Sequence, residues 1–134
     1  MRSPSTCALF CLAVAAFAGA GCGASATAGD VALGVEFALA PGQSVAVGED
    51  GFPVRFVAVV EDSRCPKDVT CVRAGRVVVS VTAGTAAEPS TLEPEGSVNA
   101  RGHRLRLVRV EPYPTSVMAI PPSEYRATFV VDGV

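Results

Sequence analysis

Beyond residue 30, apolar and polar side chains alternate along the chain with the two-residue period of a β-strand. This region shows no apolar spacing typical of a helix of ordinary length. The alternation and the high valine content favour an all-β fold. We expect a small antiparallel β-sandwich or a partly open barrel of about six to eight strands. The predicted strands cover residues 35–40, 43–47, 54–61, 76–82, 103–111 and 125–131.

Three of these strands carry further information about pairing. The middle of strand 54–61 is apolar on both sides, which predicts a central strand covered on both faces. The valine-rich strand 76–82 is expected to pair with it in antiparallel orientation. In 103–111 the apolar period changes phase, so the strand either contains a bulge near Leu107 or is itself covered on both sides.

Two long connections separate the later strands. Residues 83–100 are rich in Gly, Thr, Glu and Pro and predict one short edge strand, since edges tolerate proline. Residues 112–124 contain four prolines and cannot pair as a central strand, so they must cross the surface or rim of the domain. We expect Val117, Met118 and Ile120 to anchor this segment.

The N-terminal segment differs from the rest in composition. A positively charged start precedes an apolar run over residues 8–18, and small residues follow, which predicts a signal peptide. The run is shorter than the roughly 20 residues of a membrane-spanning helix. Two cleavage sites fit. Gly19-Ala20-Gly21-Cys22 resembles a bacterial lipoprotein signal, with lipidation at Cys22, and Ala26-Thr27-Ala28 fits ordinary signal peptidase.

We favour the lipoprotein site, which divides the chain into a signal peptide (1–21), a flexible tether (22–30) and a β domain (31–134). About one hundred residues then remain, enough for a single domain. An exported β domain anchored in the cell envelope follows from this division.

Charge narrows the range of partners. The chain holds 11 Lys and Arg residues against 13 Asp and Glu residues, with a formal net charge of −2, so nucleic acid is not an expected partner. Positive charge is concentrated locally in four arginines: Arg101, Arg104, Arg106 and Arg109. We interpret these side chains as part of an exposed strand face. The alternative is that they contact an anionic lipid head group, a polysaccharide or an acidic peptide.

A polar loop between the two valine-rich strands carries the chain's most informative motif. Cys65 and Cys71 are the only cysteines beyond Cys22, and in an exported protein such a close pair predicts a disulfide that pins a turn, with Pro66 at its second position. A pinned, charged loop also presents a rigid surface to a partner. The candidate binding residues are Asp62, Arg64, Lys67, Asp68 and Arg73.

The loop resembles a motif of short bacterial secreted proteins and lipoproteins of uncharacterised function. The resemblance rests on Glu61-Asp62-Ser63-Arg64-Cys65-Pro66, Val69, Cys71, Ala74-Gly75 and a valine-rich strand, with Tyr125 opening the final strand. It implies export and the same fold class, and it supplies no catalytic residue. An aromatic side chain is common in that family at the position of Arg73.

Catalytic and metal sites are hard to build from this sequence. The chain has one histidine, His103, which we expect at the surface, and it lacks a Gly-x-Ser-x-Gly turn and a Cys-x-x-Cys pair. Calcium binding by Glu61, Asp62 and Asp68 is opposed by neighbouring basic residues, so a solvated charge cluster is favoured there. We therefore expect no catalysis, cofactor or metal.

The sequence thus predicts a cell-envelope β domain with a binding or structural role, anchored to the membrane through a lipid at Cys22. Its expected partner is an envelope protein or a polysaccharide. The alternative is a secreted protease inhibitor or peptide-binding module that uses the loop around Cys65 and Cys71.

Overall fold

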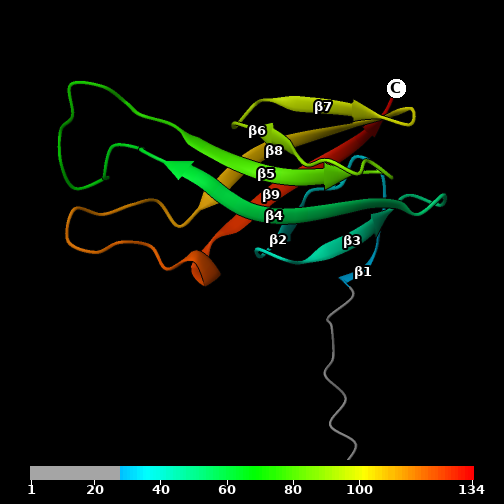
Figure 1. Cartoon of the computed structure of the whole chain (residues 1–134), viewed down its shortest axis with the longest axis horizontal. Coiled ribbons are helices and arrows are strands. Elements are labelled where there is room, and N and C mark those ends of the chain that lie inside the picture. Colours follow the sequence, from blue (N-terminus) through cyan, green and yellow to red (C-terminus); the bar gives the residue numbers. More distant parts are fainter. Residues whose placement is uncertain (1–27) are drawn as a thin grey trace, which may run out of the picture.

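Two β-sheets packed face to face form the part of the chain that the computed structural model describes, residues 28–134 (Figure 1). The first sheet has the strand order β1-β3-β4-β5-β6 and the second has the order β2-β9-β8-β7. All pairings are antiparallel except that of β1 with β3. The strands are β1 (Ala28–Val31), β2 (Phe37–Leu39), β3 (Ser44–Val47), β4 (Phe52–Asp62), β5 (Val77–Ala83), β6 (Ser90–Leu92), β7 (Ser97–Ala100), β8 (His103–Glu111) and β9 (Arg126–Gly133), and a 3₁₀ turn η1 (Pro122–Glu124) precedes β9.

The predicted all-β class is confirmed. The structure is a sandwich and not a partly open barrel, because the two sheets do not close on each other. Strand β1 begins at Ala28, so the last three residues assigned to the tether belong to the first sheet. The predicted signal peptide and Cys22 lie outside the described residues. Within residues 28–134, no helix is long and apolar enough to span a membrane.

The core lies between the sheets and is built from the alternating apolar positions of the strands. The Phe129 ring meets Phe56 from the opposite sheet edge to face, with ring centroids 6.0 Å apart, and lies 6.1 Å from Phe37 of its own sheet. The most deeply buried large side chains are Phe56, Phe129, Leu39, Leu105, Leu107, Val47, Val54, Val79, Val81 and Val131.

Strand β4 occupies the middle of its sheet as predicted, but the prediction that both of its faces are covered is wrong. Val54 and Phe56 are buried, whereas Val57 and Val60 are exposed on the strand. In the described chain the second layer packs against one face only, and valine on the other face reflects β propensity rather than burial. Two irregularities in register, around Val57 and Val60, interrupt the pairing with β5.

Of the two interpretations of the phase change in β8, the bulge is the one that the structure confirms. Leu107 pairs with Phe129 and Arg109 pairs with Thr128, so Val108 is the extra residue. The shift turns Leu107 and Val110 toward the core, and it leaves Val108 half-buried rather than fully inside.

The two long connections differ from expectation. Residues 83–100 contain two short edge strands, β6 and β7, rather than one, and each completes the edge of a different sheet. In 112–124 Ile120 packs against the core as predicted. The prediction that Val117 and Met118 are anchors is wrong, because both side chains project into solvent.

Candidate functional site

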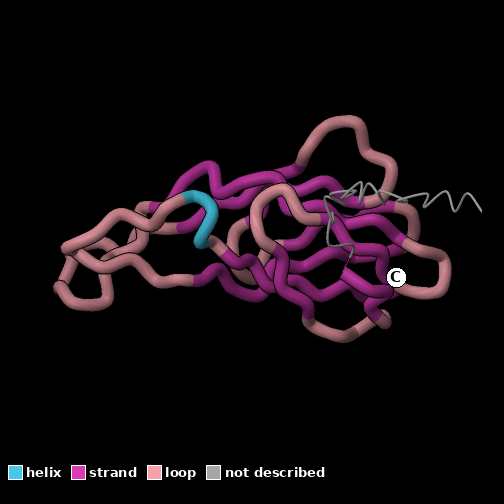
Figure 2. Tube along the Cα trace, turned by 90° about the horizontal axis from the view of Figure 1, so that it is seen from below, coloured by secondary structure: helices cyan, strands magenta, loops and turns pink. Residues whose placement is uncertain are grey.

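Two loops project together from one end of the sandwich, opposite the C-terminus (Figures 1 and 2). Residues 63–76 join β4 to β5, and residues 112–125 join β8 to β9. We call these two segments the loop pair. Their backbones meet directly, since the Lys67 amide donates to the Pro114 carbonyl at 3.1 Å. The loops come from different sheets, so this contact joins the two layers beyond the core.

A buried ion pair sits at the base of the loop pair. The Arg64 guanidinium donates from Nε and Nη2 to the two carboxylate oxygens of Asp62, at 2.8 and 2.7 Å. The Arg64 and Asp62 side chains are only 8% and 9% exposed. The Tyr125 hydroxyl donates to the same carboxylate at 2.9 Å. A carboxylate and a guanidinium removed from water to this degree are stable only with such partners.

Arg64 also connects the first loop to the second. Its Nη1 donates to the Val110 carbonyl at 2.7 Å, and its Nη2 donates to the Pro112 carbonyl at 2.9 Å. The guanidinium carbon lies 4.7 Å from the centre of the Tyr113 ring, a cation–π distance. One side chain therefore holds together the end of β4, the end of β8 and the start of the second loop.

The ionisation of the carboxylates follows from these contacts. Burial alone would raise the pKa of Asp62, but hydrogen bonds from Arg64 and Tyr125 outweigh burial and hold that pKa below its ordinary value. Burial and the hydrogen bond to Asp62 raise the pKa of the Tyr125 hydroxyl. In the loops, hydrogen bonds from the hydroxyl and backbone amide of Ser116 lower the pKa of Asp68.

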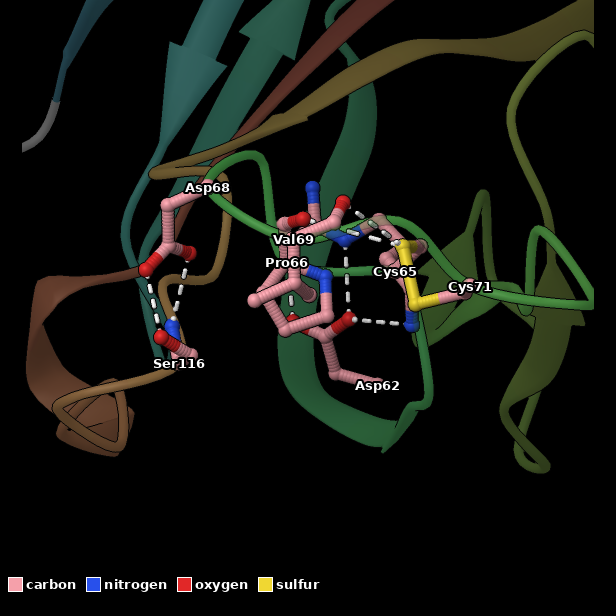
Figure 3. The surroundings of a disulfide bond; sticks show 8 residues. Asp62, Cys65, Pro66, Asp68, Val69, Cys71 and Ser116 are labelled. Atoms are coloured by element: carbon pink, nitrogen blue, oxygen red, sulfur yellow. Dashed lines mark hydrogen bonds and ion pairs between the residues drawn. A yellow bond between two sulfur atoms is a disulfide. The ribbon is translucent and has the colours of Figure 1, made fainter.

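The disulfide closes the outer half of the first loop, as predicted (Figure 3). The Cα atoms of Cys65 and Cys71 are 5.9 Å apart, within the range that a disulfide spans. Within the ring that the disulfide closes, the Val69 amide donates to the Pro66 carbonyl at 3.2 Å, which makes Pro66 the first residue of the turn. The prediction that Pro66 occupies the second turn position is therefore wrong. Asp68 points away from the ring to the second loop, where the Ser116 amide and hydroxyl donate to its carboxylate.

The inner half of the first loop continues the β4–β5 hairpin. The Ser63 amide donates to the Arg76 carbonyl at 2.8 Å, and the Cys65 amide donates to the Ala74 carbonyl at 2.9 Å. Gly75 has φ +68°, and a Cβ at this position would overlap the backbone carbonyl oxygen of Ser63. Glycine is therefore required at this crossing of the two chains.

The outer end of the loop pair carries apolar side chains in solvent. Val72 is completely exposed, and Val117 and Met118 are mostly exposed. Half of the ten large hydrophobic residues that are exposed in the described chain belong to the loop pair. One of them, Tyr113, lies at the base against Arg64. We call the other four the apolar tip: Val69, Val72, Val117 and Met118. A concentration of apolar side chains on a projecting surface is typical of an interaction site.

An open groove of about 1140 Å³ runs along the base of the loop pair. Its lining mixes Arg76, Arg109 and Arg126 with Glu93 and Glu111. Arg76 contacts Glu61 and Glu93, and Arg109 contacts Glu36 and Glu111. The charges of the groove thus largely compensate one another, so it lacks the single-sign field that would favour a charged ligand.

The structure separates the five candidate binding residues into two groups. Asp62 and Arg64 face inward and hold the loops in place, and Asp68 joins the two loops through Ser116. Lys67 and Arg73 are exposed and are available to a partner. Sequence reasoning missed the apolar tip on the second loop, because its apolar residues were assigned to the core.

The carboxylates considered for calcium do not converge. Glu61 binds Arg76, Asp62 binds Arg64 and Asp68 binds Ser116. The interpretation of this region as a solvated cluster is wrong for Asp62, which is buried with its partner. Among residues 28–134, no group of three or more His, Cys, Asp or Glu side chains is arranged to hold a metal ion.

His103 is also not where it was expected. It is 8% exposed and stacks on Phe52 with ring centroids 4.4 Å apart, so its predicted surface position is wrong. The reason is its strand position, which points toward the core in phase with Leu105. Its Nε2 lies 3.4 Å from the Asp50 carboxylate.

The arginines of β8 and of the turn before it were interpreted as an exposed strand face. Arg104, Arg106 and Arg109 are exposed. Arg106 lies 3.7 Å from Asp132, and Arg104 donates to the Asn99 side chain at 3.3 Å. These arginine side chains are therefore exposed but already contact polar side chains of the protein along the sheet surface.

No family model, curated protein or solved structure matches this chain. The function must therefore be argued from the loop pair itself.

Replacing Gly75 tests the crossing at the loop base. Gly75→Ala is expected to lower the free energy of unfolding by at least about 2 kcal/mol, because a left-handed Ala is strained and its Cβ overlaps the Ser63 carbonyl. Gly51→Ala is the matched control, since Gly51 has φ +65° with open space around it and should lose only about 1 kcal/mol. Equal losses in urea denaturation would contradict the close approach at Gly75.

Replacing Asp62 tests the buried ion pair. Because its pKa is lower in the folded state, the carboxylate's contribution to stability is present above about pH 4 and is lost as the pH falls through the folded pKa. Asp62→Asn should therefore cost about 3 kcal/mol at pH 7, and its difference from wild type should narrow in acid.

Urea denaturation at neutral and acidic pH measures this difference. Glu49→Gln, at an exposed turn, is the control and should change stability by less than about 0.5 kcal/mol. A difference between Asp62→Asn and wild type that is the same at both pH values would refute the assignment.

Proposed function

We propose that this protein is an exported, lipid-tethered domain of the bacterial cell envelope that binds a partner through the apolar tip. The observation that carries the proposal is the placement of Val72, Val117 and Met118 in solvent at the end of two loops that are braced from within. Leaving large apolar side chains in water forgoes roughly 1.5 to 3 kcal/mol of burial for each. A surface of this kind at the outermost point of the fold suits contact with another molecule.

The bracing supports a binding role because it removes an entropic cost. The Cys65–Cys71 disulfide, the Arg64 contacts and the Asp68–Ser116 hydrogen bonds hold the two loops in one arrangement. A surface that is already ordered does not lose further conformational freedom when a partner binds. The disulfide also suits an oxidising compartment outside the cytoplasm, in agreement with the signal peptide and the lipidation at Cys22 that we propose.

The alternative of a protease inhibitor is less well supported. A trypsin-like protease cleft accepts a basic side chain, and in this loop Arg64 is buried and bound to Asp62 and to two backbone carbonyls. Lys67 keeps an exposed side chain, although its backbone amide is bound to Pro114. Insertion of the first loop into a cleft would also have to accommodate the second loop, which is attached to its side.

Intact mass measurement tests the tether. Protein recovered from the membrane fraction of a producing bacterium should begin at Cys22 and carry the added mass of lipid, and Cys22→Ser should abolish this species. Cys65 and Cys71 should react with an alkylating reagent only after reduction. A soluble species that begins near Gly29 would instead indicate ordinary signal cleavage and a secreted protein.

Photo-crosslinking in cells tests the tip as the binding surface. A photoreactive benzophenone amino acid at position 72 or 118 should form crosslinks with a partner, because both side chains project from the tip. The control is position 134, which is 75% exposed at the opposite end of the domain. Crosslinks of equal yield at all three positions, or none at the tip, would count against the proposed function.

A further inference from the structure

We propose that the partner of the apolar tip is the surface of an anionic phospholipid bilayer, an inference that rests on the binding role proposed above. The tip combines exposed apolar side chains with exposed basic ones. Lys67 and Arg73 belong to the first loop, beside Val69 and Val72. Apolar side chains that enter the headgroup region, flanked by Lys or Arg at the phosphates, are the typical chemistry of interfacial binding.

The charge of the loop pair differs from that of the whole chain. The loop pair holds four Lys and Arg residues and two Asp and Glu residues, whereas the whole chain has a formal net charge of −2. Arg64 and Arg76 are neutralised by carboxylates outside the loops. The Asp68 carboxylate is held by Ser116 of the second loop and keeps its negative charge, because Ser116 is neutral. Glu124, the other acidic residue of the loop pair, lines the groove at the base. Beside the apolar side chains, two cations, Lys67 and Arg73, therefore stand against one carboxylate, and the excess of one positive charge complements an anionic surface.

The shape of the tip favours a bilayer over a folded protein. Figure 2 shows the loop pair as a thin projection beyond the ends of the sheets, whereas Figure 1 shows the two loops spread apart across that projection. A stable protein interface uses about 20 to 30 residues on each side, whereas the tip offers four large apolar residues, with two cations and one carboxylate beside them. A bilayer needs no matching concavity, so a narrow convex end can bury its apolar side chains there.

The backbone of the loops is suited to shallow insertion. The Val69 amide is bound to the Pro66 carbonyl, and the Lys67 amide is bound to the Pro114 carbonyl. Internal hydrogen bonds of this kind reduce the cost of moving backbone groups out of water. The Tyr113 ring, half-exposed nearer the base, would lie at headgroup level, where aromatic side chains with a polar end are favoured.

Vesicle binding tests the inference with defined lipids. The mature chain from residue 22 onward is produced with Cys22→Ser, so that no acyl chain contributes. It should co-sediment with vesicles of mixed phosphatidylglycerol and phosphatidylcholine, bind vesicles of phosphatidylcholine alone weakly, and dissociate as salt is raised.

Paired variants identify the residues responsible. Val72→Asp with Met118→Asp should lower the partition coefficient at least tenfold, whereas Val134→Asp, an exposed valine at the opposite end, should leave it unchanged. Lys67→Ser with Arg73→Ser should lower binding to the anionic vesicles about 25-fold, at roughly fivefold for each cation.

Arg55→Ser with Arg104→Ser removes the same charge from exposed positions on the sheets and should have little effect. Thermal unfolding verifies that each variant is folded. If Arg55→Ser with Arg104→Ser lowers vesicle binding as much as Lys67→Ser with Arg73→Ser, the inference is overturned, because the net charge of the protein would then explain the binding.

The outcomes also separate this inference from the proposed function. If the chain does not bind anionic vesicles while position 72 crosslinks to a protein in cells, the bilayer assignment is wrong and the tip is a protein-binding surface. If vesicle binding and tip-specific crosslinks are both missing, the proposed function fails as well. Crosslinks from position 72 to phospholipid, together with vesicle binding, support both.

Discussion

The buried ion pair between Arg64 and Asp62 is the interaction on which the arrangement of the loops depends. A guanidinium has five N–H donors, and those of Arg64 reach both Asp62 oxygens and the carbonyls of Val110 and Pro112. Removing both charges from water is costly, and the cost is offset because almost every polar atom is matched. The pair therefore permits little freedom in the position of either loop relative to the sheets.

This constraint divides the residues of the loops by role. The residues that resemble the secreted-protein motif hold the structure together: Asp62, Arg64 and Tyr125 form the buried cluster, the two cysteines close the turn, and Gly75 allows the chains to cross. The proposed binding surface uses other positions, at the outer end of both loops. A rigid base with a chemically simple tip is consistent with recognition of a surface by its charge and polarity rather than by its detailed shape.

Much of the fold could be predicted because strand formation leaves a local signal. The two-residue period located the strands, and the change of phase near Leu107 located the bulge in β8. The same signal could not show which face of a strand is covered. Valines on both sides of β4 were interpreted as burial on both faces, yet Val60 is in solvent, since β propensity and burial favour the same side chain. His103 was misplaced for a different reason: its position in phase with Leu105 points toward the core, and its burial is completed by stacking on Phe52 of another strand.

By itself, the sequence determined the β class, the antiparallel β4–β5 hairpin and the disulfide, because each depends on residues that are close along the chain. Only the tertiary structure decided that Arg64 would face inward, because its acceptors lie 46 and 48 residues away in β8 and the second loop. It also decided that Val117 and Met118 would project outward beside the first loop, through contacts such as that of Asp68 with Ser116. Contacts between residues so far apart leave no periodic pattern in the sequence, so the tip emerges only when the two sheets pack.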